Sequence, residues 1–158
     1  MALSDKAEKL YDFLFERTAA LFKQTEPPPL LFVLNDEDQL VIQEMPSPDK
    51  DAWAYLHQEA AASPHCQCAV LVNEVWVLEL AGLSAEERRR AQAQATKQGI
   101  STHPLRKSAV TFNVLTQTGQ ALAVCPLETG TGMLTKGELI WLSKDSDLKV
   151  TGRFVREG

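Results

Sequence analysis

The stretch that most constrains the fold of this chain is the apolar run at residues 68–80, with the sequence CAVLVNEVWVLEL. It is rich in β-branched residues and almost continuously apolar, which is typical of a strand buried on both faces in the middle of a sheet. Because side chains alternate along a strand, Val70, Val72, Glu74 and Trp76 would share one face. Glu74 interrupts the pattern, because a carboxylate on an apolar face needs a partner. We therefore expect the chain to be arranged around this strand.

The composition predicts one globular domain, spanning residues 1–158. A chain of 158 residues, 44% of them hydrophobic, is short for two self-sufficient cores and too apolar for disorder. A net charge of −5 disfavours nucleic-acid binding and a polybasic membrane anchor, since both need a basic surface. The charged N-terminus does not resemble a secretory signal, and no segment is long and apolar enough to cross a bilayer. With only 3 cysteines, a reducing cytoplasm is the simplest compartment.

Two helices are predicted before the central strand. Residues 1–26 form an N-terminal helical segment whose apolar side chains repeat at helical spacing, and Pro27-Pro28-Pro29 ends it. The second helix starts near Ser47-Pro48-Asp49, a favourable cap and first turn, and stops by Ser63-Pro64.

A third helix is predicted at residues 84–98, after the central strand. Ser84 and Glu87 form a capping box, and Gly99 is placed to end the helix. Its body combines arginines, alanines and glutamines and contains no large apolar residue. We therefore expect an exposed, loosely docked helical insertion.

Three β-hairpins account for the remaining strands. Each combines alternating or apolar strands with a polar or glycine-containing turn, and they pair residues 30–34 with 40–45, 107–116 with 120–127, and 138–142 with 148–155. The sequence therefore predicts an α+β fold: a mostly antiparallel sheet of hairpins plus one long central strand, with the first two helices covering one face.

The first helix carries aromatic residues beside or outside its core stripe, namely Phe13, Phe15 and Phe22. One interpretation is that the helix lies in a groove and is covered on two sides. The other is that the additional aromatic surface packs against a second chain, since exposed apolar patches mark interfaces. The second interpretation predicts a homodimer through these three phenylalanines.

The cysteines and histidines do not form a recognisable metal site. His65, Cys66 and Cys68 lie close in sequence, with Cys125 and His103 as remote candidates, but zinc sites usually pair cysteines as Cys-x-x-Cys. Cys125 lies in an apolar strand, where a single cysteine behaves as a small hydrophobic residue. We also find no nucleophile elbow, no His-Glu-x-x-His motif and no phosphate-binding glycine loop. We therefore predict no metal and no cofactor, and the sequence identifies no reaction.

Glu74 has a candidate partner in the segment before the next strand. Arg106 can bind a carboxylate through two parallel hydrogen bonds, and His103 can add another. Because consecutive strands are often neighbours in a sheet, we expect a Glu74–Arg106 salt bridge with His103 close by. The pair is either an internal contact that fixes strand register, or part of a ligand site formed by Glu74, Trp76, His103 and Arg106.

The pattern Glu74-x-Trp76, followed by His103-Pro104-x-Arg106, resembles a family of small uncharacterised bacterial and phage-associated proteins. The resemblance extends through the second hairpin, with Gly119 in its turn and Pro126 at its end. It implies no catalytic residues, because the family has no established activity.

We therefore expect a non-enzymatic cytoplasmic module that assembles with itself or with another protein. The alternative is a small hydrolase or ligand-binding protein with its site at Glu74, His103 and Arg106. A deep cleft lined by these three residues would favour the alternative. A dry environment around Glu74, together with an apolar first helix at a subunit contact, would favour assembly.

Overall fold

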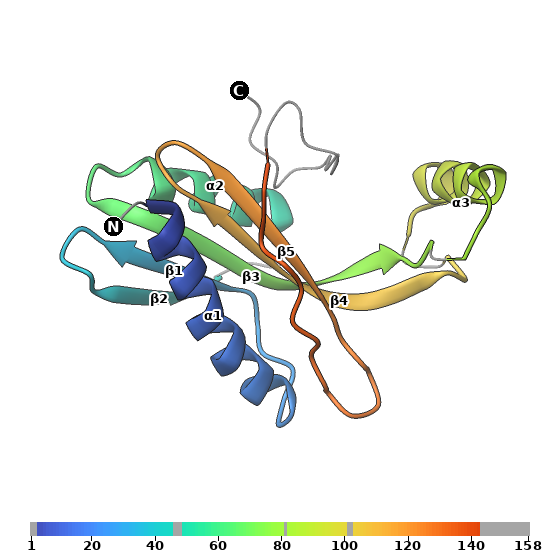
Figure 1. The fold of residues 1–158 in the computed structure, drawn as a ribbon, viewed down its shortest axis with the longest axis horizontal. Coiled ribbons are helices and arrows are strands. Elements are labelled where there is room, and N and C mark those ends of the chain that lie inside the picture. Colours follow the sequence, from blue (N-terminus) through green and yellow to red (C-terminus); the bar gives the residue numbers. More distant parts are fainter. Residues whose placement is uncertain (1–2, 46–48, 81, 101–102, 143–158) are drawn as a thin grey trace.

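The computed structural model describes residues 3–45, 49–80, 82–100 and 103–142 of the chain. Within these residues the helices and strands follow one another in the order that the sequence predicts (Figure 1). The helices are α1 (Leu3–Phe22), α2 (Lys50–Ala62) and α3 (Ala85–Gln98). The strands are β1 (Leu30–Asn35), β2 (Leu40–Glu44), β3 (Cys66–Leu78), β4 (Arg106–Leu115), β5 (Gln120–Pro126) and β6 (Ile140–Trp141).

The strands form one sheet in the order β2-β1-β3-β4-β5-β6, and every pair of neighbours is antiparallel. The predicted α+β class with a mostly antiparallel sheet is therefore confirmed. The first two hairpins are present as β1–β2 and β4–β5. Of the third hairpin, β6 belongs to the sheet, and the predicted partner at residues 148–155 lies outside the described residues.

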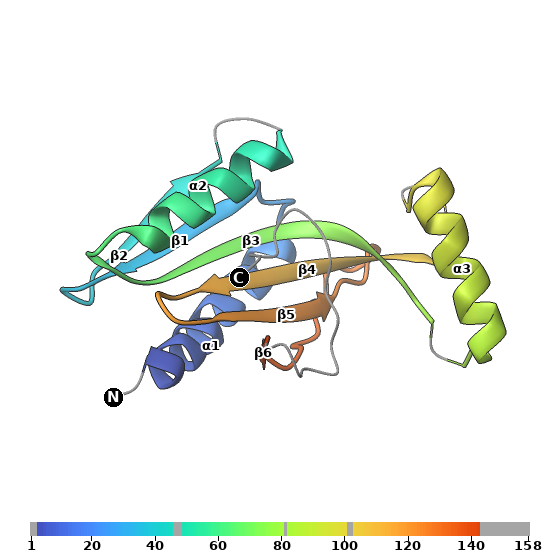
Figure 2. The ribbon, with the colours of Figure 1, turned by 90° about the horizontal axis from the view of Figure 1, so that it is seen from above.

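The first two helices cover opposite faces of the sheet, which Figure 2 shows with the sheet between them. Val70 and Val72 of β3 pack in the same core cluster as α1. Ala69 and Leu71, which alternate with them, pack in the cluster of α2. The structure differs in this respect from the expectation that both helices share one face. The strict alternation of an apolar strand explains the difference, since both of its faces need cover.

The core under α1 is built around three aromatic rings. The rings of Tyr11 and Phe15 lie 5.2 and 6.2 Å from the ring of Phe112, which is fully buried in β4. Phe22 is also buried in this cluster, whereas Phe13 is exposed. The interpretation that α1 is covered on two sides is therefore correct for Phe15 and Phe22, and their assignment to a dimer surface is wrong.

The apolar arc of α1 is wide because a second segment, in addition to the sheet, packs against the helix. Residues 127–139 run beside α1 and contribute Leu127, Leu134 and Leu139 to its core cluster. Lys136 holds Asp12 of α1 in a salt bridge of 2.6 Å. The helix thus packs against the sheet on one side and against this segment on the other.

Strands β3 and β4 continue beyond their neighbours and carry α3 at their end. Pairing of β1 with β3 stops at Val72, and pairing of β5 with β4 reaches only Ala109. We call the part of the chain from Asn73 to Ser108 the arm; Figure 1 shows α3 at its tip, away from the main sheet. The Ser84–Glu87 capping box is present, and Ala91 is the buried residue of α3. The expected exposed helix is therefore found at this position.

Candidate functional site

Glu74 lies where β3 leaves the main sheet, and its side chain is exposed. It borders a polar depression of about 290 Å³ formed with Phe22 at the end of α1, residues 23–26 after it, and residues 127–132. Because the cover of β1 ends at Val72, water reaches this carboxylate. Glu74 is therefore found neither in a dry core nor in a deep cleft with His103 and Arg106.

Arg106 contacts Trp76 instead of Glu74. Its guanidinium carbon lies 5.1 Å from the centre of the Trp76 ring, a cation–π arrangement in which the indole remains 44% exposed. Arg106 also donates a hydrogen bond of 3.2 Å from Nη1 to the backbone carbonyl of His103. The arginine thus joins the start of β4 to the turn before it.

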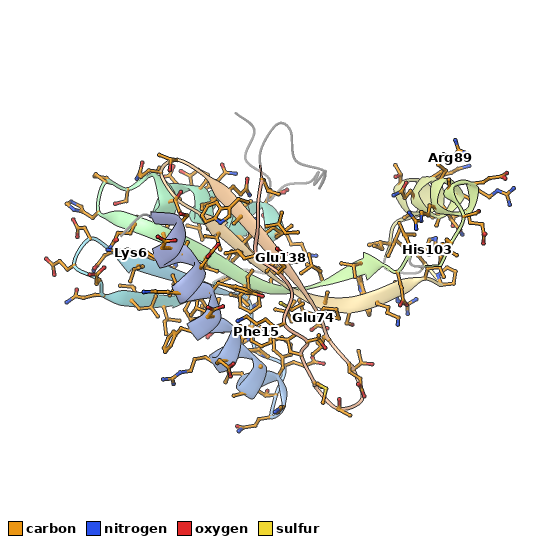
Figure 3. The ribbon with its side chains drawn as sticks, viewed as in Figure 1. Lys6, Phe15, Glu74, Arg89, His103 and Glu138 are labelled. Atoms are coloured by element: carbon orange, nitrogen blue, oxygen red, sulfur yellow. The ribbon has the colours of Figure 1, made fainter. Side chains whose placement is uncertain are left out.

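His103 is buried at the tip of the arm. Its Nδ1 accepts a hydrogen bond of 3.0 Å from the N–H of Leu105, which assigns the ring proton to Nε2. Among the described residues, no group accepts a hydrogen bond from Nε2. Figure 3 shows Glu74 at the base of the arm and His103 at its far end, so the two side chains do not meet.

The predicted Glu74–Arg106 salt bridge is wrong, and the strand register explains why. Arg106 lies opposite Leu78, whereas Glu74 lies opposite Val110. The offset of Val110 from Arg106 along the strand corresponds to about 13 Å. The structure therefore unites Trp76, His103 and Arg106 in the arm and leaves Glu74 apart from them.

The cysteines lie in the sheet and are all free thiols. Cys66 and Cys68 contribute to opposite core clusters, because the pairing of β1 with β3 shifts register between Leu34 and Asn35, and Cys125 packs under α1. Tyr11 and the backbone N–H of Gly137 both contact the Cys125 sulfur at 3.3 Å. Within the described residues, no three histidine, cysteine, aspartate or glutamate side chains converge as metal ligands.

We expect Cys66 and Cys68 to resist alkylation in the folded protein. Burial raises the pKa of both thiols, and for Cys68 the value reaches about 12. Only the thiolate reacts, so at pH 8 both residues should remain unmodified by iodoacetamide until the protein unfolds. Mass spectrometry of tryptic peptides, with and without urea, measures this. Rapid labelling of either residue in the native protein would contradict it.

An apolar groove of about 470 Å³ is lined by residues of α1, β1 and β2 and by Gln24. We call it the α1 groove. Leu14, Thr18 and Phe32 form its buried floor. Its rim includes Phe13, Leu21 and Ile42, which are 47, 39 and 60% exposed. Such a continuous exposed apolar surface is typical of a binding site.

Strand β2 forms one edge of the sheet and has exposed apolar side chains on both of its faces. Ile42 points to the α1 side, and Val41, which is 53% exposed, points to the other side. The N–H of Met45 donates to the Pro29 carbonyl, so odd-numbered residues of β2 bond to β1. The backbone groups of the even-numbered residues therefore face outward from the sheet.

Comparison with protein-family models, with curated proteins and with solved structures found no match to this chain. None of the described helices is long and apolar enough to cross a membrane.

The α1 groove and the edge position of β2 were not predicted from the sequence. The groove joins Phe13, Arg17 and Leu21 of α1 to Ile42 of β2, and only the folded chain brings them together. One signal was available: residues 40–42 are all apolar, although a strand with one solvated face should alternate. Such a run at a sheet edge is typical of an interaction surface.

Proposed function

We propose that this chain is a non-enzymatic cytoplasmic assembly module that forms a homodimer by pairing the β2 strands of two copies. The observation that carries the proposal is the exposed, apolar edge of β2. Edge strands are usually protected by a lysine, a proline, a bulge or a very short length. Strand β2 has five residues, and along them the structure shows no lysine, proline or bulge, with Glu44 as the one charged side chain.

An antiparallel β2–β2 pair has one self-complementary register that suits the outward-facing backbone groups. Ile42 lies opposite Ile42 of the second copy, and Leu40 lies opposite Glu44. All three are even-numbered, so each pair can exchange both of its N–H···O=C bonds. A twofold axis through Ile42 then makes one continuous sheet from two copies, in an interface that uses the same surface twice.

One of the three phenylalanines of the predicted dimer surface, Phe13, belongs to this proposed interface. Phe13 lies on the rim of the α1 groove together with Ile42, so it stands near the proposed twofold axis. Phe15 and Phe22 do not take part because they are buried in the core. The free cysteines are compatible with the reducing cytoplasm that we propose as the compartment.

We expect light scattering of the wild-type protein to give twice the chain mass of 17.5 kDa at high protein concentration. Ile42→Lys should give the monomer mass, because two like charges would lie directly opposite in the pair. Glu44→Pro should weaken the dimer by removing an outward-facing N–H, while the hydrogen bonds to β1 remain.

Tyr55→Lys is the matched control, because Tyr55 of α2 is a large apolar side chain about as exposed as Ile42 but lies away from β2. It should leave the dimer intact. Circular dichroism checks that each variant is folded. A wild-type monomer at high concentration, or dimers that persist in both Ile42→Lys and Glu44→Pro, would refute the proposal.

A further inference from the structure

We infer that the α1 groove is a binding site for a free long-chain carboxylate, with the acyl chain on its apolar floor and the carboxylate on Arg17. The inference does not rest on the β2 pairing, although Phe13 and Ile42 of the groove rim also lie at the proposed β2–β2 contact. Backbone groups of β2 that face outward from the sheet make that pairing, whereas the ligand would lie between α1 and the face of the β1–β2 hairpin.

The lining of the groove fits an acyl chain. Its side chains are mostly aliphatic or aromatic, and the floor residues Leu14, Thr18 and Phe32 are buried. A volume of about 470 Å³ lies within the range of small-molecule sites, about 300–1,000 Å³. A polar metabolite would lose hydration there without regaining hydrogen bonds.

The charge of the groove selects an anion. Arg17 is the charged residue in the lining, and no aspartate or glutamate accompanies it, although the chain as a whole has a net charge of −5. Within the described residues, Arg17 makes no salt bridge. Its guanidinium carbon lies 5.1 Å from the centre of the Phe13 ring, which holds the cation at the rim.

A carboxylate matches this arrangement because the planar guanidinium offers two parallel N–H donors. Gln24, seven residues beyond Arg17, also lines the groove, and its amide adds a hydrogen-bond donor to the lining. The site therefore combines an apolar channel with one cation, which is the pattern expected for a long-chain carboxylate.

The test is isothermal titration calorimetry of laurate, 1-dodecanol and dodecylamine, each below its aggregation concentration. We expect saturable binding of one laurate per chain, weaker binding of dodecanol and no binding of dodecylamine. Arg17→Gln should weaken laurate binding by about tenfold and leave dodecanol binding essentially unchanged. Arg89→Gln, on the exposed helix α3 labelled in Figure 3, is the matched control and should change neither.

Ala20→Trp tests whether laurate binds in the α1 groove or on another apolar surface of the protein. Ala20 is exposed and lines the groove, so the indole should obstruct it without disturbing the core, and laurate binding should be lost. Ala93→Trp on α3 is its control. Equal affinity for laurate and dodecanol, unchanged laurate affinity in Arg17→Gln or Ala20→Trp, or binding only to anionic vesicles would overturn the inference.

The same titration on Glu44→Pro separates this inference from the proposed dimer. A dimeric wild-type protein and a monomeric Glu44→Pro variant that both bind laurate support both proposals. Laurate binding by a wild-type protein that is monomeric refutes only the proposed function. A dimer that binds no laurate, including as Glu44→Pro, refutes only the carboxylate site.

Discussion

We expect Phe15→Glu to unfold the protein under conditions in which Phe13→Glu remains fully folded. The two phenylalanines are two residues apart on α1, yet Phe15 is buried against Tyr11 and Phe112 and Phe13 is exposed. The substitution at position 15 removes a core ring and places a carboxyl group in its cavity. Both effects act on the folded state alone.

The expected loss of unfolding free energy for Phe15→Glu is at least about 4 kcal/mol, combining the lost aromatic packing with the burial of a polar group. Lys136 lies 5.8 Å from the Phe15 ring and would offset only part of this, because it already pairs with Asp12. A typical domain has about 5–15 kcal/mol in total, so most of the folded population should be lost.

Phe13→Glu should change the unfolding free energy by no more than about 0.5 kcal/mol, since a glutamate there can pair with Arg17 at the next turn. Urea titration monitored by circular dichroism compares the variants. Similar midpoints for the two would show that Phe15 is not a core residue. Under the proposed function, the folded Phe13→Glu variant should still have a weakened dimer.

Signals confined to neighbouring residues allowed most of the elements to be predicted from the sequence. The capping box of Ser84 and Glu87 is complete within one turn of helix. The hairpins β1–β2 and β4–β5 form, as predicted, around short polar or glycine-containing turns. The long apolar strand at residues 68–80 is present as β3, shifted by two residues, because a continuous β-branched run has few other stable placements.

The contacts that depend on distant parts of the chain could not be predicted in the same way. Phe15 and Phe22 are covered by residues 127–139, and nothing in the helix sequence indicates where that segment runs. Arg106 does precede the strand that pairs with β3, but the residue pairing depends on how far the arm extends before it turns. Adjacent strands were therefore predictable, whereas the register was not.

The remaining prediction with a large effect concerns Gly132, in the loop that follows β5. Gly132 has φ of 71° and lies against the backbone of Phe22 at the end of α1. Its N–H donates a hydrogen bond of 2.8 Å to the carbonyl of Glu128, which fixes its position. A Cβ atom there would overlap the carbonyl oxygen of Phe22.

We expect Gly132→Ala to lower the unfolding free energy by about 2–5 kcal/mol. The left-handed conformation costs a residue with a Cβ about 1–2 kcal/mol, and displacing packed backbone costs about 1–3 kcal/mol more. Gly130→Ala in the same loop is the control, because its Cβ would meet open space and Gly130 has no positive φ. Thermal unfolding should therefore show a drop in Tm of about 10 °C for Gly132→Ala and almost none for Gly130→Ala. Equal melting temperatures for the two variants would mean that the loop does not pack against α1 in solution, and that Phe22 is covered in some other way.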